Sequence, residues 1–135
     1  MWIITPLGFF SVVRKKGDTH LTVRARVAQD LDRLRERYLP DLSSTRAGAG
    51  TDYPYRASVS ARSWALALSD MGRDIDYSNF KDEVARVQGH ARAHVYANVW
   101  TALMGLEKQP ADPPSAPAPS PGALRPMKPI AFPRN

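Results

Sequence analysis

The chain of 135 residues contains no cysteine, which excludes disulfide bonds and cysteine-based zinc sites. It also has no apolar run near the roughly 20 residues that a membrane-spanning helix requires. The apolar start "MWIITPLGFFSVV" has no basic stretch ahead of it, and Pro6 and Gly8 break it, which favours strands over an export signal. We therefore expect a cytoplasmic protein with no membrane partner.

Several motifs of nucleotide-dependent and hydrolytic enzymes are missing as well. The chain has no G-x-x-x-x-G-K-[ST] phosphate loop, no G-x-G-x-x-G fingerprint and no G-x-S-x-G elbow. "DIDYSNFKDE" is acidic but lacks the glycine and the terminal glutamate spacing of a calcium loop. We therefore expect no cofactor and no metal ion, and a non-catalytic role is favoured over an enzymatic one.

Proline is scarce in the first 106 residues and abundant afterwards, with nine of the twelve prolines beyond Glu107. Proline lacks a backbone donor and fixes φ, so such a segment cannot form a regular helix or a strand ladder. Residues 107–135 are therefore predicted to be a disordered tail with polyproline-II character. Two hypotheses remain for this tail, a dispensable extension and a docking strip for a partner. Residues 1–106 are expected to form one compact domain.

Within that domain, alternating and helical patterns follow one another. In residues 21–27, "LTVRARV", aliphatic and polar side chains alternate as in a half-buried strand. Helices are predicted where apolar residues recur at steps of three and four, with Ser60 or Ser63 capping the second and Asn79 the third. The expected strands are 2–5, 9–15, 21–27 and 55–60, and the expected helices are 28–39, one that follows Ser60 or Ser63, and about 80–106. This β-β-β-α-β-α-α order predicts an α+β fold with a four-stranded, mostly antiparallel sheet and helices on one face.

The last predicted helix is apolar on two sides. At 100° per residue, one arc is expected to pack on the core and contains Val84, Val87, Ala91, Val95, Val99, Ala102 and Leu106. A second apolar side is formed by Tyr96, Trp100, Leu103 and Met104. A helix that is apolar on both sides is usually covered on both. The second side is therefore predicted to meet either another helix of this chain or a protein partner, including a second copy in a homodimer. Gly89 in this helix indicates close packing or a bend between two shorter helices.

Two histidines, His90 and His94, stand four residues apart on the same helix. A zinc site would need a third ligand, and no residue at a fixed spacing supplies it. The pair could instead act as general base and acid on a phosphodiester, with Lys81 or Arg92 holding the phosphate. That arrangement would suit a small metal-independent ribonuclease, which is an alternative function. The third interpretation is an ordinary helix face.

The chain carries a formal net charge of +6, and most of its 19 basic residues are arginines. Arginine binds phosphates and carboxylates through paired donors. Arg24 and Arg26 alternate away from the apolar face of their strand, and Arg14 and Arg56 are predicted to share the same sheet surface. Tyr53 lies just before the fourth strand. Arginines interleaved with aromatic residues on a sheet predict a binding or accessory protein that contacts nucleic acid or another polyanion.

Four blocks, "GFFSVV", "VRAR", "GTDYPYR" and "DYSNFK" followed by "QGHARAH", occur in this order within residues 2–106. In these blocks the chain resembles a group of small uncharacterised bacterial proteins of about this length. The resemblance implies a compact bacterial domain and leaves the proline-rich tail outside it. It transfers no activity, ligand or site residue.

Overall fold

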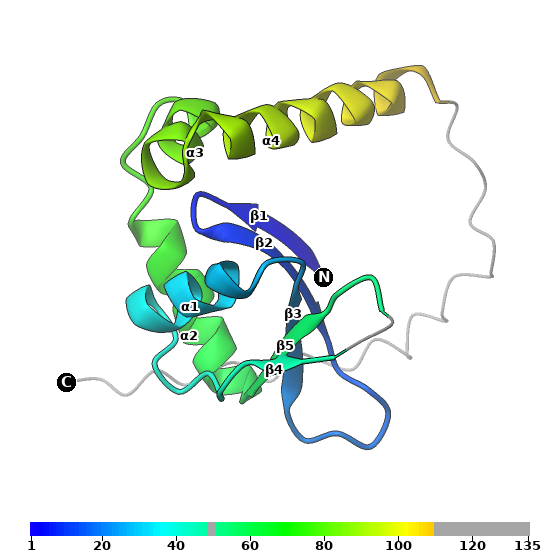
Figure 1. Cartoon of the computed structure of the whole chain (residues 1–135), viewed down its shortest axis with the longest axis vertical. Coiled ribbons are helices and arrows are strands. Elements are labelled where there is room, and N and C mark those ends of the chain that lie inside the picture. Colours follow the sequence, from blue (N-terminus) through cyan, green and yellow to red (C-terminus); the bar gives the residue numbers. More distant parts are fainter. Residues whose placement is uncertain (49–50, 110–135) are drawn as a thin grey trace, which may run out of the picture.

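A computed structural model of the chain describes residues 1–48 and 51–109 (Figure 1). In these residues, five antiparallel strands form one sheet in the order β1-β2-β3-β5-β4, accompanied by four α-helices and a short 3-10 helix. The strands are β1 (Trp2–Thr5), β2 (Gly8–Val13), β3 (Leu21–Ala25), β4 (Arg46–Ala47) and β5 (Tyr55–Val59). The helices are α1 (Ala28–Arg37), α2 (Ala61–Arg73), α3 (Phe80–Gln88), α4 (His90–Leu103) and η1 (Met104–Lys108).

The predicted α+β class and the antiparallel sheet are confirmed, with one strand more than predicted. The additional strand, β4, lies between the helix expected over 28–39 and the strand expected over 55–60, and it pairs with β5 at the sheet edge. A two-residue strand is too short to show alternation, so the sequence carries no pattern that would reveal it.

One face of the sheet carries the main hydrophobic core. Val12, Val23 and Ala57 are cross-strand partners on this face, and all three are buried. Helices α1 and α2 cover it with Leu31, Leu34, Trp64 and Ala67. Ser60 caps α2 by accepting a 3.0 Å hydrogen bond from the backbone N–H of Ser63. Asn79 caps α3 in the same way, with the N–H of Asp82 as donor at 3.1 Å, as the sequence predicts.

The last predicted helix is two helices. Gly89 separates α3 from α4 with φ of 89° and ψ of 164°, a conformation open almost only to glycine. Because the chain changes direction at Gly89, the side chains over 84–106 do not form one continuous helical arc, and that prediction is wrong. Val84 is buried as predicted, whereas Val95 and Val99 are exposed and Ala93 and Tyr96 face the protein instead.

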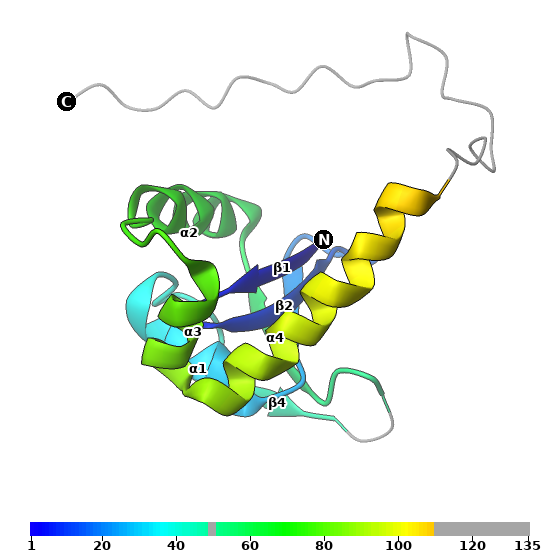
Figure 2. The same ribbon diagram turned by 90° about the horizontal axis from the view of Figure 1, so that it is seen from above.

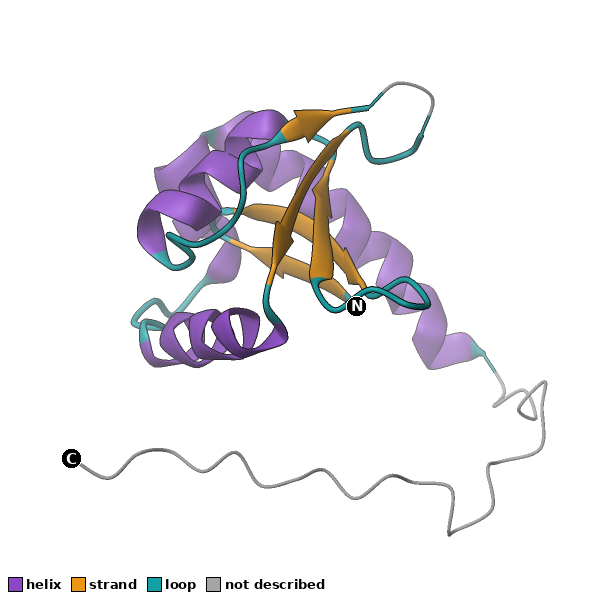
Figure 3. Ribbon diagram, turned by 90° about the horizontal axis from the view of Figure 1, so that it is seen from below, coloured by secondary structure: helices purple, strands orange, loops and turns teal. Residues whose placement is uncertain are grey.

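Helices α3 and α4 pack on the opposite face of the sheet from α1 and α2. Val84, Ala93 and Tyr96 form a second buried cluster against Ile4 and Phe9, which are cross-strand partners. Figures 2 and 3, drawn from opposite sides, show α4 in front of the β1–β2 hairpin and behind it, respectively. The expectation that helices pack on one face is therefore wrong for this part of the chain. The hairpin contains consecutive apolar residues, "II" and "FF", and consecutive strand residues point to opposite faces, so both faces need cover.

The described structure continues three residues past the expected domain end at residue 106. The remaining part of the predicted tail, residues 110–135, lies outside the described residues. Among the residues that are described, no helix combines the length and the apolar composition that would let it cross a membrane.

Candidate functional site

Three arginines stand side by side on the sheet face opposite the main core. Arg24 of β3 is the cross-strand partner of Ser11 on one side and of Arg56 on the other. Arg46 of β4 is the next partner of Arg56. Directly paired residues of antiparallel strands point to the same face, so these side chains form one row across the sheet. Arg46 was missed because its strand was not predicted.

Arg14 does not belong to this row, which corrects the predicted register. Ser11 is the β2 residue that faces Arg24, so the odd-numbered residues of β2 share the arginine side. Arg14 follows the alternation of Phe10 and Val12, which belong to the buried core, and it lies exposed just beyond the end of β2. A shift of one residue in register moves a side chain to the other face.

Tyr53 contacts the guanidinium groups of three arginines on this face of the sheet. Its ring is buried, and the guanidinium carbons of Arg24 and Arg26 lie 4.7 and 5.1 Å from the ring centroid. Arg24 Nη2 also donates a 2.7 Å hydrogen bond to Ser11 Oγ. Arg56 donates to the carbonyl oxygen of Tyr53 at 3.3 Å and to Thr51 Oγ1 at 2.8 Å. These contacts restrict the side chains before any ligand arrives, which lowers the entropy cost of binding.

The guanidinium groups of this arginine face, defined as Arg24, Arg26, Arg46 and Arg56, have no carboxylate partner within 4.0 Å among the described residues. The ion pairs of the described residues involve arginines of the helices instead: Arg33, Arg35, Arg37, Arg73, Arg86 and Arg92. These six helix arginines are therefore paired within the fold, whereas the charges of the arginine face are available to an external anion.

A depression of about 800 Å³ adjoins one end of the arginine face. Arg46 and Arg56 line it together with Lys15 and His20 from the β2–β3 turn. Thr22, Ser43 and Ser58 also line the depression, and so do Asp18 and Asp41. Basic groups and hydroxyls in one open depression are suited to phosphate oxygens.

The predicted partner surface on the last helix divides into two parts. Tyr96 is buried, because its ring stacks on Phe80 at 6.1 Å inside the second hydrophobic cluster. Trp100, Leu103 and Met104 are exposed, with 66% of the surface of Trp100 accessible to solvent. Every residue from Asn98 to Gln109 is exposed, and Figures 1 and 2 show this half of α4 extending past the sheet. The exposed apolar surface of α4 therefore excludes Tyr96 and includes Val95 and Val99.

The residues of the ribonuclease hypothesis are spread over α3 and α4. His90 and His94 are exposed in the first turns of α4, and Lys81 is exposed in the first turn of α3. Arg92 points into the protein, where it binds Asp30. Within residues 1–48 and 51–109, no group of three or more His, Asp or Glu side chains is placed to hold a metal ion. Catalysis by the histidines stays a prediction, and loss of RNA cleavage in His90→Ala would test it.

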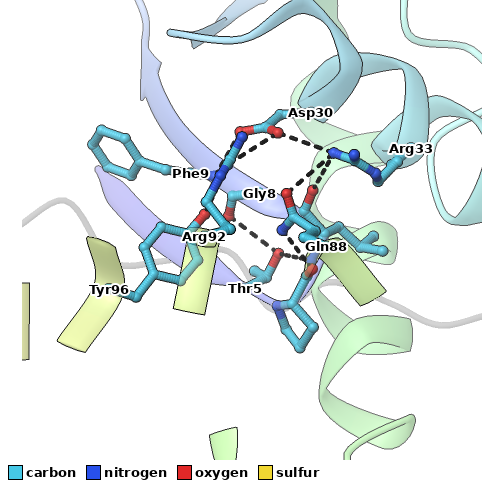
Figure 4. A network of polar contacts seen from close by, with 10 residues as sticks. Thr5, Gly8, Phe9, Asp30, Arg33, Gln88, Arg92 and Tyr96 are labelled. Carbon is cyan, nitrogen blue, oxygen red and sulfur yellow. Dashed lines mark hydrogen bonds and ion pairs between the residues drawn. The ribbon is translucent and has the colours of Figure 1, made fainter. Parts of the chain in front are cut away.

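Asp30 is a buried carboxylate that joins three elements (Figure 4). It accepts hydrogen bonds from the N–H of Phe9 at 3.2 Å, from Arg33 Nη1 at 3.1 Å and from Arg92 Nη1 at 2.9 Å. Gln88 completes the network, accepting from Arg33 at 3.2 Å and donating to the carbonyl oxygen of Pro6 at 2.6 Å. The network attaches α1, the β1–β2 hairpin and the α3–α4 junction to one another.

The neighbourhood of Asp30 changes the ionisation of its partners. Burial alone would lower the pKa of Arg92, but hydrogen bonds to Asp30 and Tyr96 raise it. Burial raises the pKa of Tyr96, while its hydrogen bond with Arg92 opposes the shift. A signal for Asp30 exists in the sequence, because it falls next to Leu31 and four residues before Leu34 on the buried side of α1. A carboxylate in such a position needs a cationic partner.

Comparison with known proteins finds no matching family model, no matching curated sequence and no matching solved structure. The function of the site has to be argued from its own geometry and charge.

Proposed function

We propose that this protein is a non-catalytic binding protein that contacts nucleic acid or another polyanion through the arginine face. The observation that supports this proposal is the arginine face itself, whose guanidinium groups lack carboxylate partners among the described residues. Three of its four arginines, Arg24, Arg26 and Arg56, contact Tyr53. Arginine pairs favourably with phosphate through its planar set of donors. Charges that are already positioned and lack internal partners need not break an ion pair in order to bind.

Binding to a labelled oligonucleotide over a range of salt concentrations tests the proposal. Arg26→Ala combined with Arg46→Ala removes two exposed charges of the arginine face. Arg62→Ala combined with Arg73→Ala removes two exposed charges from α2 and is the matched control, because the net charge changes equally. Each lost phosphate contact reduces the slope of log affinity against log salt by about 0.7 for a single strand. We expect a reduction of about 1.4 for the first variant.

The control variant should leave the slope close to that of the parent protein. Equal losses in the two variants would mean that binding follows net charge alone, and the arginine face would have no special part. An unchanged slope in the Arg26→Ala, Arg46→Ala variant would also contradict the proposal. Circular dichroism of both variants shows whether the fold is retained.

We also propose that the projecting half of α4 associates with the same half of a second copy. Exposed apolar side chains support this proposal, and residues 95–106 contain no Asp, Glu, Lys or Arg. Two such helices can therefore pack together without burying a charge. The exposed apolar residues of this segment are Val95, Val99, Trp100, Leu103, Met104 and Leu106.

Sedimentation equilibrium over a range of concentrations tests the second proposal. We expect a dimer that Trp100→Ala weakens by roughly 30-fold or more, because a central tryptophan often contributes about 2 kcal/mol or more at an interface. Trp2→Ala is the control, because Trp2 is similarly exposed and lies on the sheet. A parent protein that is monomeric at every concentration would contradict self-association.

A further inference from the structure

From the placement of Trp2 we infer that the arginine face binds single-stranded nucleic acid in preference to a duplex, with Trp2 as the platform on which a base stacks. This inference rests on the proposed function and names its ligand class. The row of paired residues across the sheet continues beyond Ser11. Trp2 of β1 is the cross-strand partner of Ser11, so the full order is Trp2, Ser11, Arg24, Arg56 and Arg46.

Trp2 is held in place, yet its ring is open to solvent. The edge of the ring contacts Phe9 with centroids 5.7 Å apart and planes at 89°. The strand ladder continues past it, since the N–H of Val12 donates to the carbonyl oxygen of Met1 at 2.8 Å. Nevertheless 74% of the surface of Trp2 is accessible. An edge-on contact leaves the ring faces free, and a free ring face on a fixed strand is what base stacking requires.

The other aromatic residues of this face are already engaged. Tyr53 is buried under Arg24 and Arg26, and Phe9 lies partly covered between Trp2 and Tyr53. Trp2 is therefore the aromatic side chain of the row that can accept a base. Neighbouring strands lie about 4.8 Å apart, so the four steps from Trp2 to Arg46 span about 19 Å. A single strand lying across the sheet can place a base on Trp2 and its phosphates on the arginines.

A duplex fits this surface less well. Its bases are stacked on one another and unavailable to Trp2, so only its phosphates could be used. Helix α4 also lies on this face of the β1–β2 hairpin, packed on Ile4 and Phe9. A helix with its side chains is about 10 Å across, and it forms a ridge beside Trp2. A flexible single strand can follow the sheet surface next to α4.

Fluorescence anisotropy with three labelled probes at one salt concentration tests the inference. The probes are a single-stranded oligonucleotide, the corresponding duplex and heparin. We expect the parent protein to bind the single strand more tightly than the duplex. Trp2→Ala should weaken single-strand binding by roughly 5- to 100-fold and leave heparin binding unchanged, because stacking contributes to the single strand alone. Trp2→Tyr should retain most of the single-strand affinity.

The control is Leu66→Ala, which removes an exposed apolar side chain of α2, outside both proposed surfaces, and should change neither affinity. If Trp2→Ala binds the single strand as the parent does, or loses heparin and single-strand affinity together, the stacking role is wrong. Both results leave the arginine-face proposal standing. If none of the three probes binds the parent protein, the proposed function fails and the inference fails with it. Thermal melting of Trp2→Ala confirms that the variant is folded.

Discussion

Replacing Asp30 by alanine should destabilise the protein far more than removing an exposed carboxylate. The side chain is 1% exposed and accepts from a backbone N–H and two guanidinium groups. Removing one partner of a buried ion pair costs about 3–5 kcal/mol. Here the side chains of Arg33 and Arg92 remain 33% and 21% exposed, so water can take over part of their solvation. We therefore expect a loss of about 2–4 kcal/mol in the free energy of unfolding.

Urea unfolding at neutral pH, followed by circular dichroism and tryptophan fluorescence, measures this loss. With an m-value of about 2 kcal/mol/M, in the middle of the usual range, the midpoint should fall by about 1–2 M. Asp70→Ala is the control, because Asp70 pairs with Arg73 on the surface of α2 and such pairs contribute about 0.5 kcal/mol or less. A double-mutant cycle of Asp30→Ala with Arg92→Met should give a coupling of about 1 kcal/mol or more. A loss below about 1 kcal/mol, or one equal to that of Asp70→Ala, would refute the anchoring role of Asp30.

Two glycines and one tyrosine give three further predictions. Gly8→Ala should destabilise the protein by about 1–3 kcal/mol in urea unfolding, since the new Cβ would lie 2.5 Å from Asp30 Cγ. Gly89→Ala should cost about 1–3 kcal/mol in the same assay, because φ of 89° with ψ of 164° strains any other residue, whereas Gly72→Ala inside α2 should not destabilise. Burial raises the pKa of Tyr96, so its contribution to stability is present below about pH 10 and is lost as pH rises through the raised pKa. Tyr96→Phe should therefore flatten the alkaline decline in melting temperature, and an identical decline would contradict this.

Much of the fold could be predicted because its signals are local. The alternation in residues 21–25 places Val23 in the core and Arg24 on the opposite face, as the sheet confirms. The caps at Ser60 and Asn79 follow from side chains that satisfy the free N–H groups of a helix start. Each of these features depends on neighbours within a few residues. The periodic spacing of apolar residues and the capping side chains were therefore sufficient to predict these features.

The wrong predictions arise where one residue determines the face on which the neighbouring side chains of a helix or strand lie. Gly89 was recognised as an interruption, and of its two interpretations the bend between shorter helices is the one the structure has. Once the chain turns there, a single helical wheel assigns Val95 to the core and Tyr96 to the surface, which is the reverse of what the structure shows. The prediction for Arg14 was wrong for a similar reason in a strand. Because Ser11 pairs with Arg24, the even-numbered residues of β2 lie on the core side, and Arg14 follows their alternation.

Long-range contacts explain the remaining gap. Arg46 joins the candidate site only through pairing with Arg56, and nothing within "STRAG" signals a strand. Asp30 meets Arg92 across 62 positions of sequence, so its partner could not be identified even though its place on the buried side of α1 called for one. Contacts of this kind depend on how the helices are arranged around the sheet. A pattern within one segment does not contain that information.

The β1–β2 hairpin divides one sheet face between two uses. Near its turn, Ile4 and Phe9 lie beneath α4, and the Asp30 network holds the helix junction there. Two residues further from the turn, about 7 Å along the strands, Trp2 and Ser11 begin the row that leads to the arginines. Because α4 is fixed at the turn end, it covers Phe9 and leaves Trp2 open. A change in the Asp30 network would shift α4 relative to Trp2, so stability variants of Asp30 cannot serve as controls for binding.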